Sequence, residues 1–565
     1  MPPPTPPNPI PEDDPRERRF FWLSLLGSLS AGLGLRIWNL RGQVLGGDEL
    51  HAVRAAVART VPEILTTYSL TDHSLPLTAL FRWLLDHGFS LSEWVLRLPS
   101  LLCGVLALLV FPRAFAGRVP RPALMLYAWL AAISPALVLY SRIARSYLPM
   151  VLTGFIAVMA FERWWRLRSW KWGIVYVLFG ALAVWLHLGA APFVVSPFLF
   201  ALGDLFFRKD DRGKRLLGLL ILGTVLSLSF ATFLIPAHAS ILRLIAKKSV
   251  EQEIALGTVW DVLRLQAGTA SHTIAALFWI GALTGLFLLF RDRPRLAAFT
   301  LTVTTGHLIG LLVLSPFGMG HPIVLNRYVL PTLPFVLLWV AHALGRLWLR
   351  KPKGCPDLAA QRYGTRILLL LLFWTGPFLA PGYRDGSFMH HNDFVDFVHP
   401  RATLPDEFVP ALYRDLPRGP VLEIPWPTVW DHNRVVYIYQ RIHDRRVMVS
   451  APFDLPRHPG IDFRNEVPPD AAAILESPAR TLVLHLRLPW EEDRVQTPGR
   501  PPSRRMRPPV RQDYRRFAER FAARLVEEWG PPDRSEGFVR VWDLERVRRR
   551  QVRSAVDFWP SREGS

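Results

Sequence analysis

Cysteine is almost absent from this sequence. Its 565 residues include two, Cys103 within an apolar run and Cys355 within a basic segment. Two cysteines in such different surroundings exclude a disulfide framework and a zinc site built on thiolates. Lysine is also missing from the last third, because residues 384–565 carry 30 Arg, no Lys and 27 acids. That part of the chain is therefore nearly neutral.

Acidic residues are scarce before residue 384. Residues 1–383 contain 37 of the 67 Lys and Arg but only 19 of the 46 Asp and Glu. They therefore carry +18 of the net charge of +21. Most of this excess lies in short segments between apolar runs. Such a distribution is typical of the cytoplasmic face of a membrane protein and not of a nucleic-acid groove. We therefore predict no nucleic-acid partner.

Long apolar runs dominate what is present. The chain is 50% hydrophobic, with a mean hydropathy of +0.19 and 21 Trp. Runs of about 20 residues, the length of a helix that crosses the hydrocarbon core, recur. They predict a polytopic membrane protein with about eleven transmembrane helices and the lipid bilayer as a partner. The predicted spans are 20–40, 96–115, 122–141, 148–163, 172–190, 191–207, 215–236, 272–290, 296–316, 328–349 and 366–383.

The basic segments predict the orientation of these spans. With the N-terminus in the cytoplasm, every second connection is cytoplasmic, and each of these connections is rich in Arg or Lys. They are 117–121, 162–171, 208–215, 291–295 and 350–366. Residues 1–19 begin with Pro and acids and are predicted to be disordered. We predict a bacterial inner-membrane protein whose residues 384–565 lie in the periplasm.

Three segments are predicted outside the cytoplasm. The connections 41–95 and 237–271 have helical periodicity with mixed polarity, which favours helices lying in the membrane interface. The tail 384–565 instead has short β-like runs and intervening helical stretches, so it predicts a soluble α/β domain. The runs lie at 420–424, 435–439, 447–449, 481–486 and 538–542, with a helix at 514–529 and a loop at 494–511.

The first of these connections opens with a pair of acids. Asp48 and Glu49 follow two glycines, and a structural reading suffices for them, since Asp caps helices and Glu suits a helix N-terminus. A carboxylate held at the water–lipid boundary could also remove a proton from an acceptor hydroxyl. The two readings are compatible, because a capping Asp is held rigidly.

The order of the motifs resembles one enzyme family. The segments are GGDELH at 46–51, DHSLPL at 72–77, RLPS at 97–100, SP at 134–135 with YSRIARSY at 140–147, and NRYVLP at 326–331. In this order they resemble the integral-membrane glycosyltransferases with the C-type (GT-C) fold. The similarity is to glycosyltransferase family 39, in the branch of the protein O-mannosyltransferases and the aminoarabinose transferase of lipid A.

The resemblance implies an inverting transfer of sugar from a polyprenyl-phosphate-linked donor. The acceptor would be an extracytoplasmic lipid, polysaccharide or protein. The resemblance implies Asp48 as the general base with Glu49 as its catalytic neighbour. Asp72 and His73 would join Glu49 in binding the sugar or a divalent metal cation. That cation is the one cofactor that the resemblance suggests. A purely structural polar cluster is equally compatible with these residue types.

Arginines at the non-cytoplasmic ends of spans are candidate ligands for the donor phosphate. The planar guanidinium donates hydrogen bonds in pairs and suits a phosphate. The candidates are Arg142, Arg145 and Arg327, accompanied by Tyr147 and Tyr328. An arginine that only reaches the membrane interface is the alternative for Arg142.

Two other functions compete with the transferase. A carrier or flippase of lipid-linked sugars would share the spans, but ion-coupled transport usually needs ionisable groups near the midplane. The central parts of the predicted spans carry no Asp, Glu, Lys or Arg. A non-catalytic envelope assembly protein would use Asp48 only as a helix cap.

Overall fold

The computed structural model describes residues 15–38, 40, 49–68, 74–89, 93–207, 211–248, 254–316, 318–349, 366, 369–376, 411–424, 471–477, 479–487 and 508–557. The chain forms two compact units. The first unit comprises Met1–Leu40, Pro62–Ala79 and Trp94–Tyr383, and the second unit comprises Arg41–Val61, Leu80–Glu93 and Arg384–Ser565.

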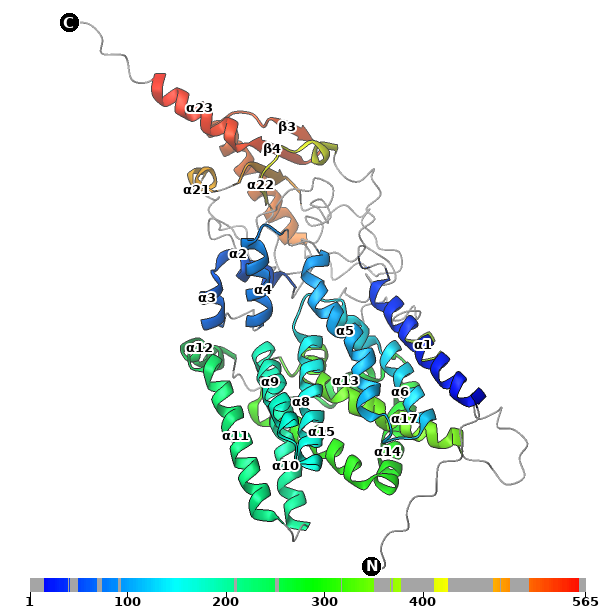
Figure 1. The fold of residues 1–565 in the computed structure, drawn as a ribbon. Coiled ribbons are helices and arrows are strands. Elements are labelled where there is room, and N and C mark those ends of the chain that lie inside the picture. Colours follow the sequence, from blue (N-terminus) through cyan, green and yellow to red (C-terminus); the bar gives the residue numbers. More distant parts are fainter. Residues whose placement is uncertain are drawn as a thin grey trace, which may run out of the picture. The chain divides into compact units, whose positions relative to one another are not determined.

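The first unit is a bundle of helices (Figure 1). They are α1 (Pro15–Ile37), α3 (Val61–Thr66), α5 (Glu93–Phe115), α6 (Arg121–Ile133), α7 (Pro135–Ser141), α8 (Tyr147–Leu167), α9 (Trp170–Leu186), α10 (Ala191–Phe207), α11 (Arg212–Leu234), α12 (His238–Lys248), α13 (Leu256–Ala267), α14 (His272–Asp292), α15 (Pro294–Leu314), α16 (Pro322–Val329) and α17 (Leu333–Leu349). Two 3₁₀ turns, η1 (Leu188–Ala190) and η2 (Leu330–Thr332), interrupt them. Among the described residues, seven helices are long and apolar enough to cross a membrane, or eight if α6 and α7 form one bent span. The predicted multi-pass helical region is confirmed, and the total of about eleven spans stays a prediction.

Proline explains two of the differences between the predicted spans and the observed helices. The span predicted at 122–141 is bent by 51° between α6 and α7. Pro135 has no N–H and disfavours helical backbone at Ser134, so one continuous helix is interrupted there. The span predicted at 328–349 begins earlier, at Pro322, and tightens into η2 around Pro331.

Glycines permit close approach where α17 packs against α14 and α6. A Cβ at Gly285 of α14 would lie 1.7 Å from the carbonyl oxygen of Trp339 in α17. A Cβ at Gly345 of α17 would lie 2.7 Å from the backbone of Ala123 in α6. Small residues at such contacts are how membrane helices pack closely, because lipid gives helices no hydrophobic reason to associate.

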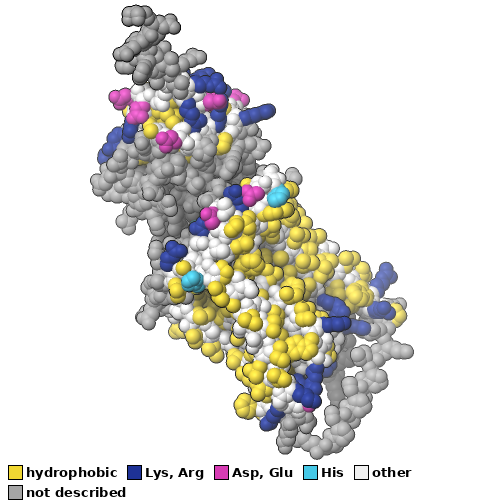
Figure 2. Space-filling view, turned by 60° about the vertical axis from the view of Figure 1, so that its left-hand side comes forward, with side chains coloured by type: hydrophobic (Ala, Val, Ile, Leu, Met, Phe, Trp, Pro, Cys, Tyr) yellow, Lys and Arg dark blue, Asp and Glu magenta, His cyan; other side chains and the backbone are white. Residues whose placement is uncertain are grey.

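The surface of the first unit is strongly apolar. Figure 2 shows hydrophobic side chains over a wide area of the described helices, with Lys and Arg gathered along its lower right border. Large apolar side chains that stay exposed include Phe206, Phe207, Phe287 and Val313. A soluble monomer rarely exposes so continuous an apolar surface, so this surface is suited to contact lipid.

Both predicted interfacial connections contain helices, as their periodicity indicated. The first connection forms α2 (Glu49–Ala58), α3 and α4 (Leu75–Asp86), and the second forms α12 and α13. Within the first unit the two connections are joined, since the backbone N–H of Tyr68 donates to Ser240 Oγ at 2.9 Å. Tyr68, Leu75 and Ala237 form a small apolar cluster beside this bond. Asp48, Asp72 and His73 lie outside the described residues.

The predicted tail contains a four-stranded sheet in the order β1-β2-β4-β3. The strands are β1 (Val421–Ile424), β2 (Thr481–His485), β3 (Arg534–Glu536) and β4 (Val539–Asp543). β1 and β2 are parallel, and β4 is antiparallel to both β2 and β3. Strands expected at 420–424, 481–486 and 538–542 are confirmed, whereas those expected at 435–439 and 447–449 lie outside the described residues. β3 and the final helix α23 (Leu544–Asp557) were not predicted.

The two faces of this sheet are covered differently. One face packs on α21 (Ala471–Glu476), α22 (Pro508–Trp529) and α23 through a core around Leu422, Leu482 and Trp542. The other face is covered by the 3₁₀ turn η5 (Ala411–Asp415), whose Tyr413 packs among valines of the strands. Helix α22 begins within the segment 494–511 that was predicted as a loop, so the α/β tail is confirmed with a longer helix.

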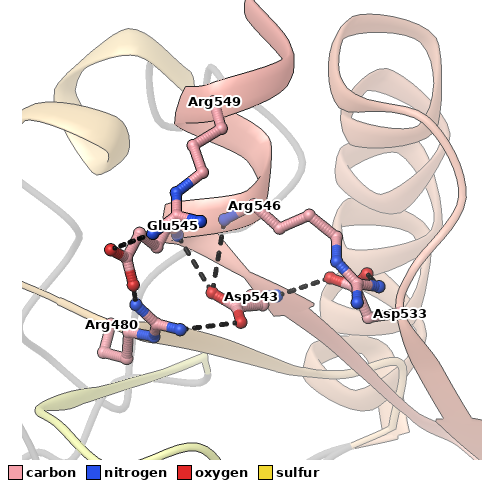
Figure 3. Close-up of polar contacts among 6 residues, drawn as sticks. All are labelled: Arg480, Asp533, Asp543, Glu545, Arg546 and Arg549. Carbon is pink, nitrogen blue, oxygen red and sulfur yellow. Dashed lines mark hydrogen bonds and ion pairs between the residues drawn. The ribbon is translucent and has the colours of Figure 1, made fainter.

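Ion pairs fix α23 to the sheet (Figure 3). Arg480, which immediately precedes β2, pairs with Asp543 at 3.1 Å and also with Glu545. Asp543 in turn accepts hydrogen bonds from the backbone N–H groups of Glu545 and Arg546, so it caps the helix. An N-cap is worth about 0.5–2 kcal/mol, and an opposite charge near a helix N-terminus about 0.3–1 kcal/mol.

The orientation can be tested through the two cysteines. We expect Cys355, in a variant with Cys103→Ser, to resist an impermeant thiol reagent in intact cells and to react after the membrane is opened. Ser535→Cys, exposed on β3, is the positive control, because the tail is predicted to lie outside. Labelling of Cys355 in intact cells would contradict the predicted topology.

Candidate functional site

Three breaks in the helices of the first unit place polar side chains together. The turn 142–146 separates α7 from α8, η1 follows α9, and η2 follows α16. Backbone groups released at such breaks must find partners inside the protein, so broken membrane helices are tolerated where side chains or cavities satisfy them. The candidate ligands Arg145, Tyr147, Arg327 and Tyr328 all lie at these breaks.

Tyr147 is the centre of this arrangement, which we call the Tyr147 cluster: Tyr140, Arg145, Tyr147, His187, Arg327 and Tyr328. The Cζ atom of Arg327 lies 5.2 Å from the centroid of the Tyr147 ring, and that of Arg145 lies 5.9 Å from it. The rings of Tyr140 and His187 approach the same ring, with centroids at 5.2 and 5.7 Å. Two guanidinium groups thus share one aromatic ring, at distances typical of cation–π contacts.

Buried polar groups hold Arg327 and Tyr328. The Tyr140 hydroxyl is hydrogen-bonded to the side chains of Arg327 and Asn326. His307 of α15 binds the carbonyl oxygen of Tyr328 through Nε2 at 2.8 Å, and Nε2 must therefore carry the proton. This bond satisfies a carbonyl near Pro331, where the missing N–H interrupts the helical ladder.

The turn that carries Arg145 is anchored from two sides. Ser100 Oγ of α5 donates to the Arg145 carbonyl oxygen at 2.7 Å. Ser146 Oγ and Ser74 Oγ lie 2.6 Å apart, which joins the turn to the first connection. Ser100 belongs to the predicted RLPS motif and Ser74 to the DHSLPL motif, so both segments now have a structural role at the cluster.

Arg142 lies only three residues before Arg145 but makes different contacts. Its Nη1 donates to the carbonyl oxygens of Leu35, Arg36 and Trp38 at 3.1, 3.1 and 2.6 Å, where α1 ends. Burial, followed by the nearby charge of Arg97, lowers the pKa of Arg142 to about 9, so it stays charged at neutral pH. These bonds satisfy carbonyls that a helix end leaves without partners.

Two further buried arginines were missed by the sequence reasoning. Arg36, fully buried in the last turn of α1, donates to the carbonyls of Gly32 and Ala132 at 2.9 and 3.1 Å. Arg97 donates to the carbonyl of Leu40 at 3.4 Å. The available signals were the RLPS motif for Arg97 and, for Arg36, a charge that interrupts an apolar run just before the first connection. Their contacts tie α1 to its neighbours.

Of the predicted base and metal ligands, the structure describes only Glu49. Glu49 is the first residue of α2 and is 2% exposed, while Asp48, Asp72 and His73 lie outside the described residues. Among the residues that the structure describes, no group of three or more His, Cys, Asp or Glu side chains is arranged to hold a metal ion.

The sheet of the tail contains a polar cluster that sequence reasoning missed. Glu423 Oε1 lies 3.4 Å from His485 Nε2. The Tyr413 hydroxyl donates to Glu423 Oε1 and lies 2.8 Å from His485 Nε2. All three side chains are buried. The available signal was a carboxylate inside the apolar strand β1. Because these residues are up to 72 positions apart, only the fold brings them together, and their burial among valines favours a structural role.

Tyr413→Phe should destabilise the tail by about 1–3 kcal/mol, because it removes a hydrogen bond from a buried carboxylate. Glu423→Gln should cost less, since its amide oxygen can still accept from Tyr413. The measurement is the rate at which protease cleaves the tail of the purified full-length protein. Equal resistance of wild type and Tyr413→Phe would contradict the importance of this bond.

Among known proteins, this chain is similar in fold to several solved structures. No family model and no curated protein matches the sequence. The chain is similar to the archaeal oligosaccharyltransferase AglB from Archaeoglobus fulgidus in complex with an inhibitory peptide and a dolichol-phosphate, with a TM-score of 0.46 and 13% identity, covering 84% of this chain and 70% of that one. It is also similar to ArnT from Cupriavidus metallidurans in the apo state, with a TM-score of 0.45 and 13% identity, covering 77% of this chain and 86% of that one. At such identity and such TM-scores, neither similarity assigns an activity to this chain.

Proposed function

We propose that this chain is a membrane glycosyltransferase that moves a sugar from a polyprenyl-phosphate-linked donor to an extracytoplasmic lipid, polysaccharide or protein. The observation that supports the proposal is the meeting of Arg145 and Arg327 on Tyr147. Two cations that share a ring within a membrane bundle favour an anionic ligand, and a phosphodiester attached to a lipid could approach from the bilayer.

The proposed chemistry divides between these arginines and the first connection. Arg145 and Arg327 would hold the donor phosphate, and their charges would stabilise the lipid phosphate as it leaves. Asp48 would remove the proton of the acceptor hydroxyl as its oxygen forms a bond to the anomeric carbon. The bond from that carbon to the phosphate oxygen breaks on the opposite face, so the configuration inverts and the lipid phosphate leaves. Glu49 would orient the sugar or Asp48. Tyr328 completes the donor set as proposed from the sequence.

A divalent cation remains a proposal of the same kind. Its donors would be Glu49, Asp72 and His73, of which the structure describes Glu49 alone. Carboxylate oxygens are ligands that hard divalent cations accept. The steps above do not depend on it, and activity after treatment with a chelator tests the requirement.

The test is a transfer assay on purified protein in lipid nanodiscs. Polyprenyl-phosphate-linked sugars are supplied with an extract of cell-envelope acceptors, and free polyprenyl phosphate is measured. We expect the lipid phosphate to be released and the sugar to appear on an acceptor. A carrier would instead move intact donor between leaflets of a vesicle, and an assembly protein would do neither.

A further inference from the structure

We infer that Gln266 of α13 is a positioning residue that directs the guanidinium of Arg327. The second connection, 237–271, would then take part in donor binding although it supplies no charge to the donor. This inference rests on the proposed function, because it concerns the same donor site. Its evidence is a line of buried hydrogen bonds that leads from α13 to the Tyr147 cluster.

The first part of that line joins α13 to α16. Gln266 Nε2 donates to Asn326 Oδ1 at 2.7 Å, and both side chains are at most 4% exposed. Asn326 and Arg327 both bind the Tyr140 hydroxyl. Gln266 therefore fixes Asn326, Asn326 fixes the Tyr140 hydroxyl, and that hydroxyl fixes one side of Arg327. Hydrogen bonds in a buried network are mutually strengthened, since water does not compete for them.

The oxygen of the Gln266 amide, Oε1, lies in a different environment from its nitrogen. Gln266 Oε1 and Ser134 Oγ are buried and have no hydrogen-bond partner among the described residues. Both residues line one small cavity of about 20 Å³ beside Pro135 and Gly268. That volume accommodates one water molecule, which could bridge the two oxygens. Nε2, at the other end of the amide, is the atom that donates to Asn326.

Helix α13 is a firm base for this contact. Gly268 ends the helix at φ +76°, a conformation that favours glycine, and a Cβ there would lie 2.4 Å from Pro135. Val262 packs against Leu325 and Val329 of α16. These two contacts set the position of Gln266 relative to α16. The hydrogen bond from Trp279 Nε1 of α14 to the Leu263 carbonyl, at 2.9 Å, instead joins α13 to α14.

Arg327 requires such support because its surroundings are an interrupted helix. An arginine side chain has many rotamers, and a phosphate binds best to a guanidinium that already points toward it. Removing the support should weaken donor binding while the chemical step, which the base controls, continues. The expected signature is therefore a rise in KM at nearly constant kcat.

The test uses Gln266→Met, which keeps the length of the side chain and removes the amide. We expect the KM for the polyprenyl-phosphate-linked donor to rise about five- to tenfold, the usual effect of one hydrogen bond, with kcat changed by less than about twofold. Gln266→Leu is the second variant if Gln266→Met is not recovered from the membrane. Trp279→Phe is the control, because it removes one hydrogen bond of α13 without touching the line to Arg327, and it should lower thermal stability without raising KM.

A double-mutant cycle distinguishes positioning from general damage. If Gln266 acts through Asn326, Gln266→Met combined with Asn326→Leu should raise KM no more than Asn326→Leu alone. A wild-type KM in Gln266→Met, or additive effects in the pair, would overturn the inference while Arg327→Gln still weakens donor binding. Unchanged donor affinity in Arg327→Gln would overturn the donor site itself and the inference with it.

Discussion

Asp48→Asn is expected to abolish sugar transfer while the protein still folds, inserts and binds donor. Asn and Asp cap helices about equally well, so the substitution preserves a structural role at the start of α2. Asn cannot accept a proton, and general-base catalysis is worth about 10²–10⁴-fold in rate. The transfer rate at saturating donor and acceptor, with matched amounts of protein in the membrane, measures the effect.

Glu49→Gln is the matched control for this experiment. It makes the same chemical change at the next residue, which is buried at the first position of α2. We expect a smaller loss of rate, because Glu49 is proposed to orient the sugar or the base and not to take the proton. Near-normal transfer by Asp48→Asn would remove this residue as the base and leave helix capping as its role.

Arg145→Gln and Arg327→Gln are each expected to weaken donor binding by about 1.5–3 kcal/mol, the scale of a charge-assisted hydrogen bond. This corresponds to roughly 10- to 150-fold in affinity. Arg→Lys at either position should restore only part of the loss, because a point charge replaces the planar fork. Titration of the purified protein with donor, at one fixed salt concentration, measures the affinity.

Arg142→Gln is the comparison within the same turn. Arg142 donates to three carbonyl oxygens at the end of α1, so its loss should appear mainly as lower thermal stability. A loss of donor affinity as large as that of Arg145→Gln would place Arg142 in the donor site, as the sequence suggested. Unchanged affinity in both Arg145→Gln and Arg327→Gln would remove the Tyr147 cluster from donor binding.

The sequence by itself determined the features that depend on neighbouring residues. Apolar runs predicted the helices of the first unit, because a helix needs about 20 apolar residues to cross a bilayer. Short β-like runs predicted strands such as β2 and β4. The candidates Arg145, Tyr147, Arg327 and Tyr328 were also chosen from the sequence, because they lie at the predicted non-cytoplasmic ends of spans and in motifs that resemble those of the family.

Only the tertiary structure decided which of these side chains meet. Arg142 and Arg145 have similar sequence surroundings, yet one binds the end of α1 and the other lies beside Tyr147. Gln266 and Asn326 are 60 residues apart and come together through the packing of α13 on α16. Local patterns report which face of an element is apolar. The partner of a buried polar group depends on how distant helices and strands pack against one another. That packing depends on the shapes and charges of all these elements together.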